Sequence, residues 1–254
     1  MGVTFAAMGV DARAVLAAQR EAITARINAE IPQHADSLTR MLRDSIQLCI
    51  GGAAEGRSGQ SRLGGAPDLE RGSAWPEVEG VTRWEFIGQL DLADVRAVDP
   101  HERLPAEGLL SFFHGYHQDY YDVGRVIMTP PGVELVPVPP AKGLPRKAVA
   151  ASFKPLVALP PYGSTFMPGQ LDERADFYDA WRDEIGPLHG MLGFDRHYEE
   201  KLPVEGKQVL LRIETAQGAP YDIPECPVYY FFISDAALAA GRLDEAEIFA
   251  GVPS

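Results

Sequence analysis

Apolar residues follow helical spacing near the N-terminus and occur in short runs farther along the chain. The helical spacing predicts a helix over 11–31, with Asp11 placed to cap its first turn and Pro32 directly after its end. A second, shorter helix is predicted over about 33–43. The first part of the chain therefore contains helices, and the short apolar runs begin after it.

Short apolar runs bounded by Gly, Pro and polar residues predict strands. The predicted strands are 46–50, 84–90, 108–114, 125–128, 133–136, 208–213 and 228–233. The stretch 51–65 is rich in Gly, Ser and Arg and is predicted to be a long exposed loop. A helix is predicted over 172–185, and another is predicted to start at Ser234 and end near Gly241.

The prolines between 130 and 145 break the middle of the chain into short pieces, which favours antiparallel connections over helix-linked parallel ones. We therefore predict an α+β fold with a mainly antiparallel, β-rich core and peripheral helices. We divide the chain into an N-terminal helical segment, 1–45, and a β-rich domain, 46–254.

The β-rich part contains two stretches with a similar sequence pattern. In each half, a strand with an acidic end leads through a polar loop to a strand that ends in paired aromatic residues: 87–91 and 108–113 in one half, 210–214 and 228–232 in the other. Duplication is one explanation, with repeats over about 60–135 and 189–250. The other is that any two pairs of strands look alike over so few positions.

The bulk composition excludes several classes of protein. With 46% hydrophobic and 23% charged residues, the chain has an ordinary globular composition. A formal charge of −13 repels phosphate backbones and anionic lipid surfaces, so we expect neither nucleic acid nor a membrane as partner. The two cysteines, Cys49 and Cys226, are predicted to be buried thiols in a reducing compartment, which indicates a cytoplasmic protein.

Two local patterns resemble ligand sites. Residues 51–58 match a phosphate-binding loop except that Arg57 replaces the lysine, and the glycines that follow prevent the helix that such a loop needs. We therefore expect no nucleotide and no other cofactor. Metal-binding residue types gather just after a predicted strand, at His114, His117, Asp119 and Asp122. On an extended strand the two histidines point to opposite faces, so solvated loop residues are the favoured interpretation and no metal is expected.

Several motifs together resemble the YwqG-like family, a bacterial family of unknown function. They are Ser-Arg-Leu-Gly-Gly-Ala-Pro at 61–67 with Trp75-Pro76, Phe-Ile-Gly-Gln-Leu-Asp-Leu at 86–92, His-Gly-Met-Leu-Gly-Phe at 189–194 and Tyr-Phe-Phe-Ile at 230–233. The resemblance covers about 58–250. It implies an antiparallel β-rich fold with helices packed outside, and it brings no established reaction. Arg212 departs from the family's usual glutamine, and Tyr221-Asp222 stands where the family has Trp-Gly-Asp.

The candidate ligand-binding residues follow from these motifs: Gly64, Gly65, Trp75, Gln89, Asp91, His189, Arg212 and Asp222. Trp75 is either a platform beside the glycine loop or a buried side chain at the entry to the sheet. His189 is either a general base or a structural histidine. If the halves face one another, Arg212 could meet Gln89 or Asp91 in a central polar network; otherwise the polar faces point into solvent.

Glycines, prolines and aromatic residues dominate these motifs, and no acid, base and nucleophile converge in the sequence. The favoured hypothesis is a noncatalytic binding or protein-interaction module, with a regulatory or toxin-neutralising role by analogy. Its partner would be a small molecule or a protein. The alternative is a hydrolase that uses His189 with Asp91, Asp222 or Glu214, and a His189 that is buried and bonded to backbone would favour the module.

Overall fold

The computed structural model describes residues 11–119, 121–140, 146–159, 189–194, 206–214 and 228–251. Within these ranges one large sheet contains β1 (Arg43–Ala53), β2 (Arg62–Leu63), β4 (Val81–Asp91), β5 (Leu109–His117), β6 (Asp122–Thr129), β8 (Val149–Ala158), β9 (Gly190–Met191), β10 (Lys207–Glu214), β11 (Val228–Ser234) and β12 (Glu247–Gly251). A separate ribbon pairs β3 (Asp68–Glu70) with β7 (Leu135–Pro137). All of these strand pairs are antiparallel.

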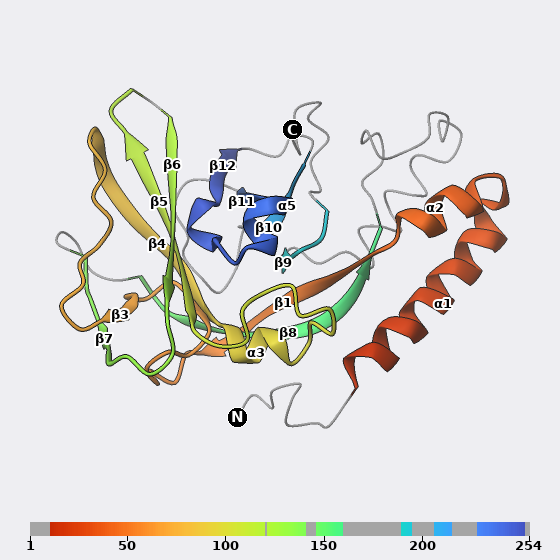
Figure 1. Ribbon diagram of the computed structural model, residues 1–254, viewed down its shortest axis with the longest axis horizontal. Helices are drawn as coiled ribbons and strands as arrows, with labels where there is room; N and C mark the ends of the chain where they lie inside the picture. The colour runs from red at the N-terminus through yellow and green to blue at the C-terminus, as the bar shows by residue number, and fades with distance from the viewer. Residues whose placement is uncertain are drawn as a thin grey trace.

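The large sheet curls into a nearly closed barrel (Figure 1). Its strand order is β12-β11-β10-β9-β1-β8-β2-β4-β5-β6, so β6 and β12 are its two edges. These edges approach one another, because a Cβ atom added to Gly124 of β6 would lie 2.6 Å from Cβ of Ile248 on β12. The main hydrophobic core lies inside the curl, where the rings of Phe112 and Phe231 meet at 4.9 Å. The predicted fold class is confirmed.

Short helices lie around the sheet. They are α1 (Ala12–Glu30), the 3-10 turn η2 (Pro32–His34), α2 (Ala35–Met41), α3 (Leu92–Arg96), α5 (Asp235–Ala239) and the 3-10 turn η4 (Leu243–Glu245). Asp11 caps α1, as predicted, by accepting a hydrogen bond from the Arg13 backbone N–H at 2.9 Å. Ser234 caps α5 in the same way. Among the described residues, no helix has the length and apolar character needed to cross a bilayer.

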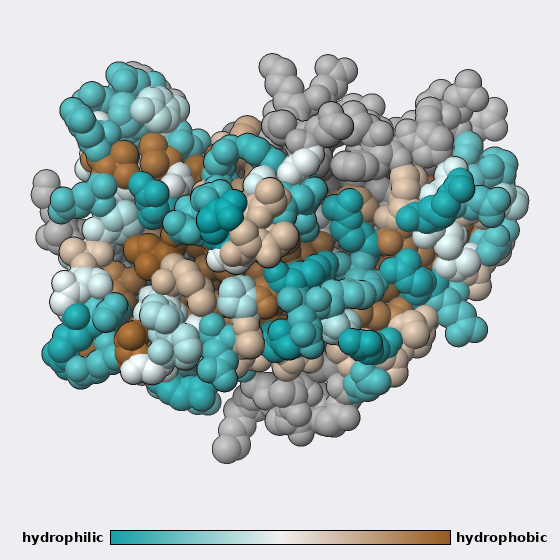
Figure 2. Space-filling model, in the orientation of Figure 1, coloured by the Kyte–Doolittle hydropathy of each residue, from teal (hydrophilic) through white to brown (hydrophobic). Residues whose placement is uncertain are grey.

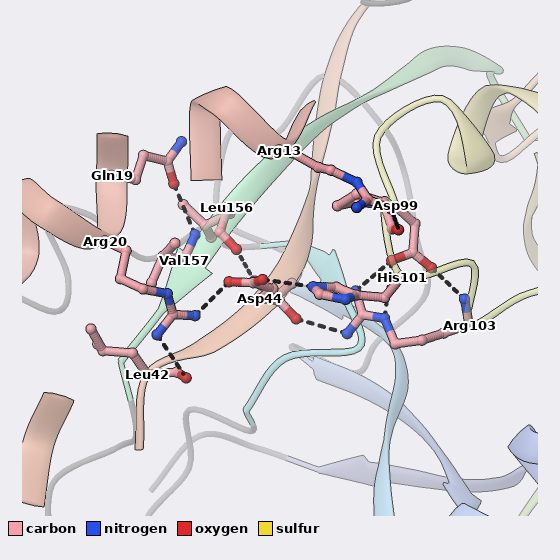
Figure 3. A network of polar contacts seen from close by, with 12 residues as sticks. Arg13, Gln19, Arg20, Leu42, Asp44, Asp99, His101, Arg103, Leu156 and Val157 are labelled. Atoms are coloured by element: carbon pink, nitrogen blue, oxygen red, sulfur yellow. Dashed lines mark hydrogen bonds and ion pairs between the residues drawn. The ribbon is translucent and has the colours of Figure 1, made fainter. Parts of the chain in front are cut away.

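The N-terminal helices are joined to the sheet by a polar network around Asp44 on β1 (Figure 3). The Asp44 carboxylate contacts Arg20 of α1 at 2.6 Å and His101 at 2.7 Å. Arg103, from the same loop as His101, donates to the Asp44 carbonyl at 2.7 Å. Burial raises the pKa of Asp44, but the contacts with His101 and Arg20 outweigh it and lower the pKa overall. The network thus links α1, β1 and the loop after α3.

The two halves of the sheet have matching strand orders. We call β8-β2-β4-β5-β6 the first half and β1-β9-β10-β11-β12 the second half. In each half a two-residue strand, β2 or β9, is inserted between a long central strand and the next long strand. The halves meet where β1 pairs with β8, in a register that includes the pair Cys49 and Ser152.

The register repeats residue by residue. Gln89 pairs with Ser111 in the first half, and Arg212 pairs with Tyr230 in the second. Each leading strand has a bulge four residues before its acidic end, at Ile87 in β4 and at Leu210 in β10. This correspondence supports the predicted duplication, because unrelated strand pairs would not share order, register and bulge position.

Most of the predicted elements are present with somewhat different ends, but some were missed. The loop prediction for 51–65 is partly wrong: β1 continues through Ala53, and the residues of β2 are buried in the sheet. Strands β8 and β12 and helix α3 were not predicted. In β8 the apolar positions are separated by Ala, Ser, Lys and Pro, which hides the alternation that burial shows. The helix predicted over 172–185 lies outside the described residues.

Candidate functional site

The glycine-proline loop of the first motif is held by a buried ion pair. Arg62 donates to Asp68 at 2.8 Å, and both side chains are more than nine-tenths buried. Arg62 also donates to the carbonyl of Ala66 at 2.5 Å. Burial raises the pKa of Asp68, but hydrogen bonds from Arg62, Gln89 and the Gly59 backbone outweigh it and lower the pKa overall. Asp68 is therefore a charged carboxylate that ties both ends of the loop together.

Gly64 and Gly65 shape this loop. Their φ angles are 67° and 79°, in the region that glycine tolerates best. A Cβ atom on Gly64 would lie 2.5 Å from the carbonyl oxygen of Lys147, so a side chain there would collide with backbone. The structure thus uses both glycines for close packing against the segment before β8.

Gln89 completes the network from the middle of β4. Its side chain is fully buried; the amide oxygen accepts from the Asp68 backbone N–H at 2.9 Å, and the amide nitrogen donates to the Asp68 carboxylate at 2.9 Å and to the Gln60 carbonyl at 3.0 Å. Such a satisfied buried network stabilises one loop conformation.

Asp91 lies at the end of β4 and caps α3. Its carboxylate accepts from the Ala93 backbone N–H at 3.0 Å, and its own backbone N–H donates to the Ser61 hydroxyl at 2.8 Å. Burial and the nearby Asp91 raise the pKa of Asp94 in the same helix. The acidic strand end predicted from the sequence is therefore a helix N-cap.

Trp75 is half-buried over the outer face of β5. Its indole N–H donates to the Val138 carbonyl at 2.8 Å, and its ring meets Phe113 edge-on at 5.5 Å. It belongs to a small apolar cluster with Leu69 and Phe86. The ring thus fastens the segment after the glycine loop to the sheet. Its half-buried state lies between the exposed platform and the buried side chain that the sequence left open.

The corresponding place in the second half holds His189, Arg212 and Glu214. Arg212 is 4% exposed, forms an ion pair with Glu214 of the same strand and lies 5.9 Å from the Tyr230 ring centre. His189 Nδ1 accepts a hydrogen bond from the Glu214 backbone N–H at 3.1 Å. Burial lowers the pKa of His189 to about 4, and the positive charge of Arg212 adds to this effect. The imidazole is therefore neutral at pH 7.

His189 occupies the position that Ser61 has in the first half. His189 receives the backbone N–H of Glu214, as Ser61 receives that of Asp91. The carbonyl groups of both residues accept from the adjacent central strand, at 3.1 Å from Leu48 for His189 and at 3.0 Å from Ala151 for Ser61. The histidine of the second motif thus has a structural counterpart that is not ionisable.

The predicted central polar network does not form. Gln89 contacts Asp68 and Gln60, and Asp91 contacts Ser61 and Ala93, so neither shares a contact with Arg212. The competing picture of solvated polar faces is also wrong, because Gln89 and Arg212 are both buried. Side chains alternate between the two faces of a strand, so Gln89 lies on the face opposite to that of core residues such as Leu90. Each half therefore buries its polar residues on the outer face of its own strands. Asp222 lies outside the described residues.

The two histidines of β5, His114 and His117, point to different surroundings, as their odd spacing predicts. His114 is 1% exposed and contacts Asp122 at 2.5 Å, whereas His117 stacks on Tyr121 with ring centres 4.1 Å apart. Asp119 lies near His117, at 3.5 Å. In the described part of the chain, no three His, Cys, Asp or Glu residues are arranged to hold a metal ion.

One polar cluster, on the inner face of the barrel wall, was not predicted from the sequence. Glu85 pairs directly with His114 across β4 and β5, and both side chains are buried. Burial raises the pKa of Glu85, against the opposing effect of Arg83 and Arg146. A histidine inside a run of buried apolar residues was the available signal, but its partner depends on the bulge at Ile87.

Hydrophilic side chains cover most of the face shown in Figure 2, and apolar residues are visible mainly in a band across its middle. The fold and site together define a curled antiparallel β protein with two matching halves, in which the motif residues hold loops against the sheet.

A comparison with protein families matches residues 61–248 to the family described as "Domain of unknown function (DUF1963)". The match covers well over half of the chain, so the chain belongs to this family. No curated protein matches the chain.

Replacing Trp75 with phenylalanine should lower the melting temperature, because the indole N–H bond to Val138 is lost while much of the ring contact with Phe113 remains. The expected loss is about 1–2 kcal/mol of unfolding free energy, measured by urea titration. Trp75→Ala should cost more, because the ring contact is lost as well. Equal stability of wild type and Trp75→Ala would contradict this role.

Proposed function

We propose that the chain is a noncatalytic binding or protein-interaction domain of the YwqG-like type, working in the cytoplasm, with its repeats near 60–135 and 189–250. The observation that carries this proposal is His189. Its ring is 8% exposed, and Nδ1 is used to hold the Glu214 backbone N–H. The most promising base in the sequence thus has a structural role.

Electrostatics support the same conclusion. A general base works best when its pKa lies near the working pH. With a pKa of about 4, His189 is a weak base at pH 7. The Glu214 carboxylate, one of the partners that a hydrolase could use with His189, is paired with Arg212. A hydrolase would need both groups turned toward a substrate, and the described contacts turn them toward the fold.

A hydrolase panel tests the proposal. Chromogenic ester, phosphate monoester and glycoside substrates should give no turnover above buffer with the wild type. His189→Asn is the matched variant, because an amide oxygen can still accept the Glu214 backbone N–H. Turnover by the wild type that His189→Asn abolishes would overturn the noncatalytic proposal in favour of the hydrolase. A regulatory or toxin-neutralising role would show instead as stoichiometric binding without turnover.

A further inference from the structure

A buried polar cluster lies on the wall formed by strands β4, β5 and β6, where its His114 ring packs against Tyr229 of β11. Glu85 and His114 are direct cross-strand neighbours, so their side chains lie on the same face. The His114 ring packs against Tyr116 at 4.3 Å and against Tyr229 of β11 at 5.1 Å. Contact with Tyr229, a core residue, shows that this face is the inner one.

The cluster contains polar atoms whose hydrogen-bonding capacity is not used. Glu85 is 7% exposed; Arg83 and Arg146 both contact its Oε1, at 2.7 and 3.2 Å, while its Oε2 has no hydrogen-bond partner among the described residues. His114 Nε2 contacts Asp122, and its buried Nδ1 likewise lacks a partner in the described ranges. A buried polar atom without a hydrogen-bond partner costs roughly 1–3 kcal/mol of folding stability. Two such atoms on neighbouring side chains therefore point to a bound group that satisfies them.

The second half shows that the fold does not require this cluster. By strand register, Gln208 and Ile233 occupy the positions of Glu85 and His114. Ile233 is fully buried in the main core, and Gln208 turns to Asp235, to which it donates at 2.7 Å. The same sheet geometry is thus built with an ordinary apolar residue where the first half has a buried histidine. Polar residues kept at a cost to stability are typical of functional sites.

Charge balance defines what the cluster can hold. Two arginines already match the Glu85 carboxylate, which disfavours a cation. Glu85 and Asp122 both present carboxylates, which disfavours an anion. In the neutral tautomer in which His114 Nε2–H donates to Asp122, Nδ1 is an acceptor, as is the Oε2 atom of an ionised Glu85. A guest that matches this arrangement is neutral and donates two hydrogen bonds.

We propose that Glu85 Oε2, His114 Nδ1 and the Tyr116 hydroxyl form a binding site for a primary carboxamide group. Its two N–H groups donate to Glu85 and His114, and its carbonyl oxygen accepts from Tyr116. The rings of Tyr116 and Tyr229 both pack against the His114 ring that the amide would contact. Burial and the nearby Glu85 raise the pKa of Tyr116 against the opposing effects of Arg83 and Tyr229, so its hydroxyl keeps the proton that it donates. This site rests on the proposed binding function and supplies its ligand chemistry.

Arg83 lies on the solvent side of the cluster. Its side chain is 52% exposed, and its guanidinium lies 4.6 Å from the Tyr116 ring centre while it contacts Glu85. Asp122 is also partly exposed, at 33%. A ligand can therefore reach the buried atoms from this side when the long Arg83 side chain moves.

Acetamide is the simplest probe. In titrations followed by ¹⁵N NMR of the histidine rings, acetamide should shift His114 Nδ1 with a Kd of about 0.1–10 mM, as expected for so few atoms. N,N-dimethylacetamide, which has no N–H donor, and acetate should cause no shift. A shift with methylammonium instead would overturn the neutral-donor assignment. No shift with any probe would mean that only water fills the site and would overturn the proposal.

Two variants complete the test. Glu85→Gln with His114→Ile copies the second half, so it should fold with an unchanged or higher melting temperature and should lose the acetamide effect. A clear drop in its melting temperature would show a structural cluster and overturn the proposal. Tyr116→Phe removes one hydrogen bond and should weaken acetamide roughly three- to tenfold; unchanged affinity would remove Tyr116 from the site. If acetamide does not bind and no His189-dependent hydrolysis is found, this carboxamide site is rejected. The proposed noncatalytic function then still stands.

Discussion

Replacing Arg62 with methionine should cost about 3–5 kcal/mol of unfolding free energy, the usual result of leaving one partner of a buried ion pair alone. Asp68 is 3% exposed, and Arg62 is the only cation that contacts it among the described residues. Methionine preserves much of the arginine's volume, so the loss reports the charge and its hydrogen bonds. Chemical unfolding at pH 7 measures it.

The controls separate burial from charge pairing in general. Arg71→Met breaks the ion pair with Glu134, whose side chains are 64% and 63% exposed, and should leave the melting temperature unchanged. Adding Asp68→Asn to Arg62→Met removes the stranded charge and should restore part of the stability, which a double-mutant cycle quantifies. If Arg62→Met unfolds like the wild type, the buried pair does not hold the glycine-proline loop.

The strands could be predicted from sequence where apolar residues were dense, and the polar network could not. Gln89 was identifiable as a polar residue inside a strand. Its partners come from a loop whose path depends on two glycines with positive φ angles and on the two-residue strand β2. The Arg62–Asp68 pair closes that loop over six positions. No periodicity marks such a pairing, because it depends on the shape of the loop.

Cross-strand partners were beyond prediction for a different reason. A shift of one residue exchanges the faces of a strand, and the bulge at Ile87 introduces one. Glu85 faces His114 only because of this bulge. The likeness of the two strand pairs, by contrast, could be predicted from the sequence, since the aligned positions Gln89 and Arg212 occupy equivalent registers in the two halves.

Acid should destabilise the protein through His189. The folded pKa is about 4 and the ordinary value is 6.5, so between these values the unfolded chain binds a proton that the folded chain does not. Stability from this residue is complete above about pH 6.5 and falls as the pH drops toward 4. At about 1.4 kcal/mol for each pKa unit, the change from 6.5 to about 4 gives a loss of up to about 3.5 kcal/mol.

The His189→Asn variant isolates this contribution. The asparagine does not titrate, so its unfolding free energy should depend less on pH than that of the wild type, with the two curves differing in slope between pH 6.5 and 4. Carboxylates such as Asp68, whose pKa is lowered in the folded state, make both proteins less stable in acid. This shared contribution cancels when the unfolding free energies of the two proteins are subtracted. Direct NMR titration of the His189 ring gives an independent measurement. A ring that titrates near its ordinary value, together with parallel stability curves, would show that His189 is hydrated and free to act as a base, and would reopen the hydrolase alternative.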